Sequence, residues 1–119
     1  MKVLVCDDDT VTLRAVEFQF RKDGFDVLKA VNGKEGQKIL VENNDIDVLI
    51  TDIYMPLMSG LELITYVRHT LQSNIPIIVL SMVNLEENIL HAYELGANSY
   101  LSKPFKMEEL SNNVKLLLK

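Results

Sequence analysis

The chain has 119 residues, of which 48% are hydrophobic and 24% charged, with a formal net charge of −5 at pH 7. This length fits one domain with its own hydrophobic core, and the composition is typical of globular proteins. The acidic balance argues against a nucleic-acid-binding surface, which needs a basic patch. No apolar run approaches the ~20 residues of a membrane span, and the amino terminus lacks a signal-peptide core. We therefore expect a cytoplasmic protein without membrane contact.

Short apolar runs alternate with segments of helical periodicity along the whole chain. The runs, rich in Val and Ile, cover residues 2–6, 25–29, 48–51, 77–81 and 99–101. This alternation predicts an α/β fold, with parallel strands joined by crossover helices that cover both faces of the sheet. Three of the runs are apolar almost throughout, as buried central strands are, whereas 25–29 and 99–101 are mixed and suit the edges.

The helical segments show apolar stripes and terminal signals. We expect the first helix to begin after Asp9 and to bury Val11, Ala15 and Phe18. The other predicted core stripes are Leu61, Ile64, Val67 and Leu71 in one helix and Leu110, Val114 and Leu117 in the last. Helix starts are predicted at Asn32, Ser59 and Asn84, each three residues before a Glu, and helix ends at Gly24 and Gly96.

Charged and hydroxyl side chains follow the predicted strands where each one ends. Asp7 and Asp8 follow the first strand, Asp52 the third, Ser81 closes the fourth, and Lys103 follows the fifth. A lone Asp at a strand end is usually a helix cap or a solvated loop residue. The carboxyl ends of parallel strands share one edge of the sheet, however, so the joint occurrence predicts a single site there.

The charges of this predicted site point to a metal ion. Asp7, Asp8 and Asp52 supply three negative charges and Lys103 one positive charge, so a divalent cation would bring the sum to zero. Carboxylate ligands without a His or Cys cluster favour Mg²⁺. A neutralised pocket could admit a phosphoryl group, with one Asp free to act as nucleophile.

The motifs resemble those of the receiver domains of two-component response regulators, a family that includes the chemotaxis regulators. The resemblance covers essentially the whole chain. It rests on Asp7-Asp8, on Asp52-x-x-Met-Pro-x-Met-x-Gly60, on Ser81, and on Tyr100-Leu-Ser-Lys103-Pro104-Phe105. It implies a doubly wound five-stranded parallel sheet of (βα)5 type with strand order 2-1-3-4-5.

The resemblance also implies the roles of the site residues. Asp52 would be the phosphoacceptor, and Asp8 and Asp52 would ligate Mg²⁺ directly. Asp7 would reach the ion through water, and the backbone carbonyl of Tyr54 would add a ligand. Lys103, preceding a cis bond to Pro104, would contact the phosphoryl oxygens. Ser81 would bind the phosphoryl group, and Tyr100 would move inward with it, altering the face formed by helix four, strand five and helix five.

On this interpretation residues 1–119 form one receiver domain, and we expect no output module within them. The phosphoryl group would come from a sensor histidine kinase or a phosphotransfer protein, and the domain would control an output domain or a partner protein without binding nucleic acid itself. A phosphorylation-dependent homodimer is compatible with the resemblance. Asn98-Ser99 argues against the charged dimer of DNA-binding relatives, which carry acidic residues there. A stand-alone regulator and a piece of a longer one both stay open.

Two other functions are compatible with parts of the sequence. Asp7-x-Asp9 after an apolar strand resembles the first motif of haloacid-dehalogenase-type phosphatases, but that reading leaves Asp52-x-x-Met-Pro unexplained. A pseudo-receiver that serves only as an interaction module would have lost an acidic or Lys position, and none is lost here. Apart from its own phosphotransfer and autodephosphorylation, we expect a regulatory domain and not an enzyme.

Overall fold

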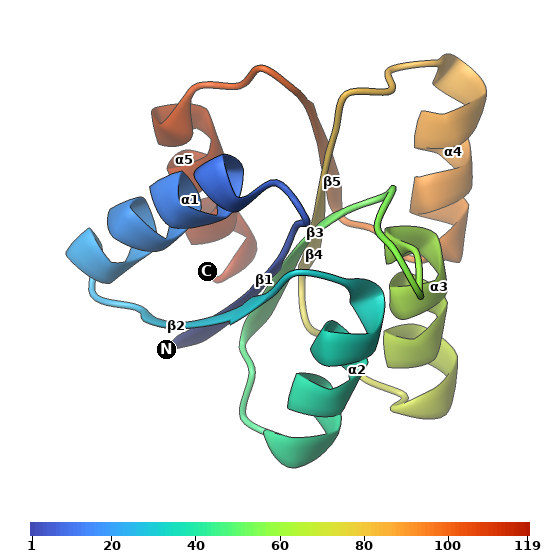
Figure 1. Ribbon diagram of the computed structural model, residues 1–119, viewed down its shortest axis with the longest axis horizontal. Helices are drawn as coiled ribbons and strands as arrows, with labels where there is room; N and C mark the ends of the chain where they lie inside the picture. The colour runs from blue at the N-terminus through green and yellow to red at the C-terminus, as the bar shows by residue number, and fades with distance from the viewer.

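The computed structural model describes all residues from 1 to 119 as a five-stranded parallel sheet between two layers of helices (Figure 1). The strands are β1 (Lys2–Cys6), β2 (Asp26–Ala30), β3 (Val48–Asp52), β4 (Ile77–Ser81) and β5 (Ser99–Ser102). The helices are α1 (Thr10–Lys22), α2 (Gly33–Glu42), α3 (Gly60–Thr65), the π-helix η1 (Tyr66–Thr70), α4 (Glu86–Leu95) and α5 (Met107–Leu117). The sheet order is β2-β1-β3-β4-β5, which confirms the predicted fold and its two edge strands.

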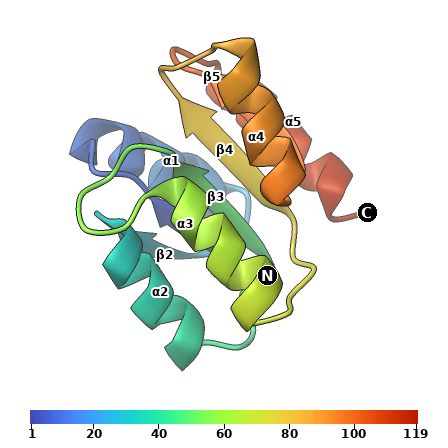
Figure 2. The same cartoon turned by 90° about the vertical axis from the view of Figure 1, so that its right-hand side faces the viewer.

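Each face of the sheet carries its own hydrophobic core. Figures 1 and 2 show α1 and α5 side by side on one face and α2, α3 and α4 on the other. Alternation along β1 supplies both cores, because Val3 and Val5 pack with the α1–α5 layer while Leu4 and Cys6 pack with the other. The central strands are thus buried on both sides, which explains their continuous apolar sequence.

The predicted buried face of the first helix is wrong. Val11 and Phe18 are 76% and 73% exposed, and the core side chains are instead Leu13, Val16 and Phe20. The two stripes overlap in sequence and have the same helical spacing, so periodicity alone could not separate them. Phe20 also makes an edge-to-face contact with Phe25, which follows the helix, and this contact exists only for the observed face.

The predicted helix ends at Gly24 and Gly96 and all but one of the predicted helix starts are confirmed. Asn32 and Ser59 cap α2 and α3, and Ser59 forms a reciprocal capping box with Glu62. The start predicted at Asn84 is wrong, because α4 begins at Glu86 after Leu85 and has no side-chain cap. The helix predicted beyond Thr65 is also not a regular α-helix, since its second half widens into η1. No helix has both the length and the apolar character that crossing a membrane requires.

Substitution of the two phenylalanines of α1 tests which face is buried. Phe20→Ala should lower the free energy of unfolding by about 3–5 kcal/mol, because it leaves a cavity in the core. Phe18→Ala, the matched control on the opposite face, should change it by no more than about 0.5 kcal/mol. Urea unfolding followed by circular dichroism measures both values. A larger loss for Phe18→Ala than for Phe20→Ala would contradict the observed orientation.

Candidate functional site

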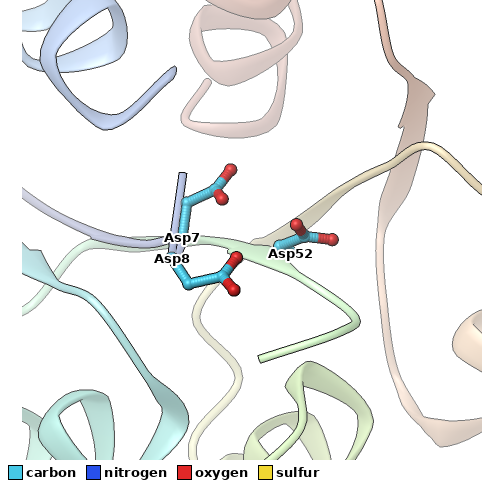
Figure 3. A group of neighbouring side chains, drawn as sticks. All are labelled: Asp7, Asp8 and Asp52. Atoms are coloured by element: carbon cyan, nitrogen blue, oxygen red, sulfur yellow. The ribbon is translucent and has the colours of Figure 1, made fainter. Parts of the chain in front are cut away.

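The predicted site residues converge at the carboxyl edge of the sheet. Asp7 and Asp8 follow β1, and Asp52 ends β3, the neighbouring strand. Each of the three offers a carboxylate oxygen, and these oxygens lie within 4.8 Å of one another. Figure 3 shows the side chains of Asp7 and Asp8 extending from β1 towards the side on which Asp52 lies. The chain thus gathers three negative charges in one place.

Lys103 is the positive group of this site. Its ammonium nitrogen lies 2.8 Å from Oδ2 of Asp7 and 3.2 Å from Oδ2 of Asp52. The side chain is only 12% exposed, and its peptide bond to Pro104 is cis, as the resemblance implies. Burial by itself lowers the pKa of Lys103, but the hydrogen bond to Asp7 and the charge of Asp52 outweigh it and raise this pKa. Lys103 is therefore firmly cationic between the two carboxylates.

Asp52 is the one carboxylate whose pKa is clearly raised by its surroundings. It is 9% exposed, and its Oδ1 accepts a hydrogen bond of 2.7 Å from the backbone N–H of Ile53. Burial raises the pKa of Asp52, Lys103 lowers it, and the negative charge of Asp7 raises it again, with a net upward shift. Asp8 differs from both neighbours in being exposed, so the cluster has one side open to water.

A close approach of backbone segments shapes the loop after Asp52. The N–H of Gly60 donates to the carbonyl of Ile53 over 2.7 Å, and a Cβ at Gly60 would stand 1.9 Å from the carbonyl oxygen of Asp52. Only glycine fits this position. This contact gives a physical reason for the glycine that ends the Asp52-x-x-Met-Pro-x-Met-x-Gly motif.

Ser81 and Tyr100 both form hydrogen bonds with the backbone of Val83. Nothing in the sequence indicates that Val83 links them. The hydroxyl oxygen of Ser81 accepts a hydrogen bond of 3.1 Å from the N–H of Val83, and the phenol of Tyr100 donates to the carbonyl of Val83. Ser81 is fully buried and Tyr100 is partly buried against the core. Backbone groups make both contacts at Val83, so no side-chain signal in the sequence could have revealed the link.

Asp9 lies outside the cluster because it caps α1. Its carboxylate accepts hydrogen bonds from the N–H of Val11 at 3.1 Å and from the hydroxyl of Thr12 at 2.8 Å. These bonds, the one from Thr12 first, lower the pKa of Asp9. Asp9 thus caps α1, as predicted. Asp9 is also the second carboxylate of the rival phosphatase motif, and that carboxylate is engaged in capping the helix. The phosphatase reading is therefore not favoured.

Comparison with known proteins agrees with this geometry. A family model described as the response regulator receiver domain matches residues 3–115. The transcriptional regulatory protein PrrA of Mycobacterium tuberculosis is 37% identical over 118 residues, covering 99% of this chain and 50% of PrrA. A chemotaxis protein CheY homolog of Campylobacter jejuni is 36% identical over 120 residues, covering 99% of this chain and 92% of the relative. The chain thus spans about half the length of the PrrA relatives and nearly all of the CheY homolog.

Solved structures give the same result. The receiver domain of the Francisella response regulator 1452 superposes with a TM-score of 0.90 at 35% identity, covering 98% of this chain and 95% of that one. The chemotaxis response regulator CheY4 of Vibrio cholerae superposes with a TM-score of 0.90 at 30% identity, covering 98% of each chain. The fold, the acidic cluster with its lysine and these relatives together show that the chain belongs to the receiver domain family of two-component response regulators.

Proposed function

We propose that residues 1–119 form a single receiver domain that accepts a phosphoryl group on Asp52 in a Mg²⁺-dependent transfer. The donor is a sensor histidine kinase or a phosphotransfer protein, and the phosphorylated form controls an output domain or a partner protein. The observation that carries this proposal is the convergence of the oxygens of Asp7, Asp8 and Asp52 beside the ammonium group of Lys103. The pseudo-receiver alternative is not favoured, because each of these charged groups is present and turned into the site.

The two oxygens of Asp52 have different surroundings, and this difference suits a nucleophile. Oδ1 is held by the N–H of Ile53, whereas Oδ2 faces Lys103. In the proposed transfer an oxygen of Asp52 forms a bond to phosphorus while the bond between phosphorus and the donor's imidazole nitrogen breaks. The electron pair of that bond stays on the nitrogen. Lys103 is placed to balance charge on the phosphoryl oxygens.

The donor set of the site fits Mg²⁺. Three carboxylates lie within reach of one ion, no His or Cys belongs to the cluster, and the exposed Asp8 leaves room for water ligands. In the proposal Asp8 and Asp52 would ligate the ion directly, Asp7 would act through water, and the backbone carbonyl of Tyr54 would add an oxygen. Bound Mg²⁺ would offset negative charge on the phosphoryl oxygens and relieve repulsion among the carboxylates.

A groove beside Lys103 supports a protein as phosphodonor. Apolar side chains from the start of α1, from the segment that precedes α5 and from the first residue of α5 line it, namely Val11, Ala15, Pro104, Phe105 and Met107, together with Asp9, Thr12, Met82 and Lys103. The exposed stripe of α1 that sequence analysis assigned to the core, Val11, Ala15 and Phe18, begins in this groove and continues beyond it. Apolar surface that adjoins a charged site is typical of docking faces. We infer that the donor's histidine approaches Asp52 from this side.

The contacts of Val83 suggest how phosphorylation reaches the surface. A phosphoryl group on Asp52 would accept a hydrogen bond from the hydroxyl of Ser81, whose oxygen accepts from the N–H of Val83 in this structure. A turn of this hydroxyl towards the phosphoryl group would therefore alter its contact with Val83. The carbonyl of the same residue holds Tyr100 on β5. We therefore propose that Ser81 and Tyr100 act as a coupled switch through this segment, which leads directly into α4. The energetic bias comes from contacts made in one state only.

Labelling with a small phosphodonor tests the central proposal. Acetyl phosphate with Mg²⁺ should add one phosphoryl group to the wild-type chain and none to Asp52→Asn, because that amide is not a nucleophile. Asp9→Asn is the matched control and should be labelled by this small donor, since the carboxylate of Asp9 caps α1 and lies outside the acidic cluster. Intact mass and peptide mapping measure the outcome, and a chelator should abolish labelling. A label on Asp7 would replace the receiver function by the phosphatase alternative.

The raised pKa of Asp52 predicts that replacing this carboxylate by a neutral amide stabilises the fold in a pH-dependent way. Its pKa in the folded chain lies above the usual 3.8, mainly because of burial, so the folded state holds this proton at higher pH than the unfolded state does. The free energy of unfolding therefore falls as pH rises from the unfolded-state pKa of Asp52 through its folded-state pKa. This loss of stability persists at pH 7. In metal-free buffer Asp52→Asn should raise the free energy of unfolding at pH 7, and the gain should vanish below the usual pKa.

Denaturant titrations at several pH values measure this difference. Asp45→Asn is the control, since Lys2 lowers the pKa of the exposed Asp45 and no gain is expected there. Adding Mg²⁺ should narrow the gap between the wild type and Asp52→Asn, because the ion stabilises the form that binds it more tightly. A wild-type chain more stable than Asp52→Asn at pH 7 without metal would contradict the electrostatic assignment.

Ser81→Ala separates phosphorylation from the response to it. We expect the variant to be labelled on Asp52, because Ser81 is not the nucleophile. The conformational response should weaken by about 1–3 kcal/mol, the value of a hydrogen bond to a charged group. NMR shifts of Tyr100 and Val83 report the response, and Ser102→Ala, an exposed hydroxyl at the end of β5, is the control. A full shift of Tyr100 in Ser81→Ala would exclude this coupling.

A further inference from the structure

Arg68 makes the densest set of side-chain hydrogen bonds in the molecule, and it lies at the edge of the sheet opposite the acidic site. Its Nε and Nη2 both donate to the carbonyl of Gly96, at 3.1 and 2.9 Å. Nη1 donates to the carbonyl of Ser73 at 2.8 Å, and Nη2 also donates to Oδ1 of Asn98 at 2.9 Å. We call these four residues the Arg68 clamp. It joins η1, the segment before β4, the end of α4 and the start of β5.

The Arg68 clamp holds a partly buried positive charge that has no salt-bridge partner. Burial lowers the pKa of Arg68, and no carboxylate lies within salt-bridge distance of its guanidinium. The charge is offset instead by carbonyl oxygens, above all that of Gly96, the residue that caps the carboxyl end of α4. The last turn of α4 has no basic residue of its own, so Arg68 supplies the cation that a helix carboxyl terminus favours.

Gly96 and Asn98 are shaped for this contact. Gly96 has a φ of +122°, and a Cβ there would stand 2.7 Å from Cγ of Arg68, so conformation and space both require glycine. Asn98 forms two hydrogen bonds with Ile77, the first residue of β4. The N–H of Asn98 donates to the carbonyl of Ile77, and Oδ1 of Asn98 accepts from the N–H of Ile77, both at 2.8 Å. The carboxyl end of α4 is thereby tied to the sheet.

The amino end of α4 has no comparable anchor. Leu85 precedes the helix without a side-chain cap, and Glu86 and Glu87 are exposed. Ala92 is the only buried residue of the helix, and it lies in the half nearer the clamp. Segments with few buried contacts open most easily. The two ends of α4 therefore differ in how firmly they are held, and the weaker end is the one connected to Ser81 and Val83.

We propose that Arg68 makes the carboxyl end of α4 its fixed end, so that phosphorylation displaces the amino end of the helix about this point. The displacement rests on the proposed function of Asp52, whereas the anchoring by Arg68 does not. Arg68 is a positioning residue on this account, since it lies far from the reacting atoms and acts through α4.

Amide hydrogen exchange of the unphosphorylated chain tests the anchor. In the wild type the amides of Gly96, Ala97 and Asn98 should exchange more slowly than those of Asn88 and Ile89. Arg68→Gln should speed exchange at 96–98 by about tenfold, the loss of one charge-assisted hydrogen bond, while amides of β1 and β3 keep their rates. The exposed Arg14→Gln is the control and should change nothing. Unchanged rates at 96–98, or equal acceleration throughout the chain, would overturn the proposal.

A second variant tests the clamp without removing it. Only Oδ1 of Asn98 takes part in its side-chain hydrogen bonds, so Asn98→Asp keeps both acceptor contacts and adds a negative charge beside the guanidinium. Exchange at Gly96 and Ala97 should slow several-fold in Asn98→Asp. In the double variant Asn98→Asp with Arg68→Gln the slowing should disappear. Slowing that persists without Arg68 would contradict the proposal, because the added charge would then act through another group.

Exchange after treatment with acetyl phosphate and Mg²⁺ tests the fixed end directly. Phosphorylated wild type should change at residues 83–89 and keep its rates at 96–98, whereas in phosphorylated Arg68→Gln the change should extend to 96–98. A wild-type change that is largest at 96–98 would overturn the proposal. If mass shows no phosphoryl group on Asp52, the proposed function fails and the displacement with it, while the anchor is still judged by the unphosphorylated chain.

Discussion

The structure of the site depends on one electrostatic constraint, which is that Asp7 and Asp52 approach each other only because Lys103 lies between them. The three residues come from the ends of β1, β3 and β5, and Lys103 is within hydrogen-bond distance of both carboxylates. Without Lys103, the like charges of Asp7 and Asp52 would disfavour ionisation of both carboxylates. Even with Lys103 in place the pKa of Asp52 is raised, first by burial and further by the charge of Asp7. Parallel strands in the order β2-β1-β3-β4-β5 are what bring these ends to one edge.

The sequence could predict that Asp7, Asp8, Asp52 and Lys103 meet at one edge of the sheet, because the signals for this are local and strong. A charged residue directly after an apolar run marks a strand end, and the topology then brings such ends together. The strands at 2–6 and 77–81 were predicted to the residue. Pairing fixed the other three: β2 is shifted to Asp26–Ala30 by its register with β1, β3 extends to Asp52, which pairs with Leu80, and β5 extends to Ser102, which pairs with Ser81. Register is a property of two strands, and neither sequence segment contains it alone.

The failures have a common cause in tertiary contacts. The two stripes of α1 are equally periodic, and only the packing of Phe20 against Phe25 and the sheet distinguishes them. Asn84 has the spacing of a cap, yet α4 starts later. The π-helix after α3 has Arg68 at its centre, and the side chain of Arg68 is held by Gly96, 28 residues away along the chain. Long-range contacts of this kind leave no periodic trace in the sequence.

The segment from Ser81 to Ser102 forms a unit whose two ends are held in different ways. At the site end, the backbone of one residue, Val83, contacts both switch residues. Its N–H donates to the hydroxyl oxygen of Ser81, and its carbonyl accepts from the phenol of Tyr100. At the other end, Gly96 is held by a guanidinium that reaches it with two nitrogen atoms. The N–H of Val83 could donate to a phosphoryl oxygen in place of Ser81, whereas the partly buried guanidinium of Arg68 is held by four hydrogen bonds to three oxygen atoms. The chemistry at each end therefore assigns mobility to the end that adjoins Asp52 and rigidity to the end that does not.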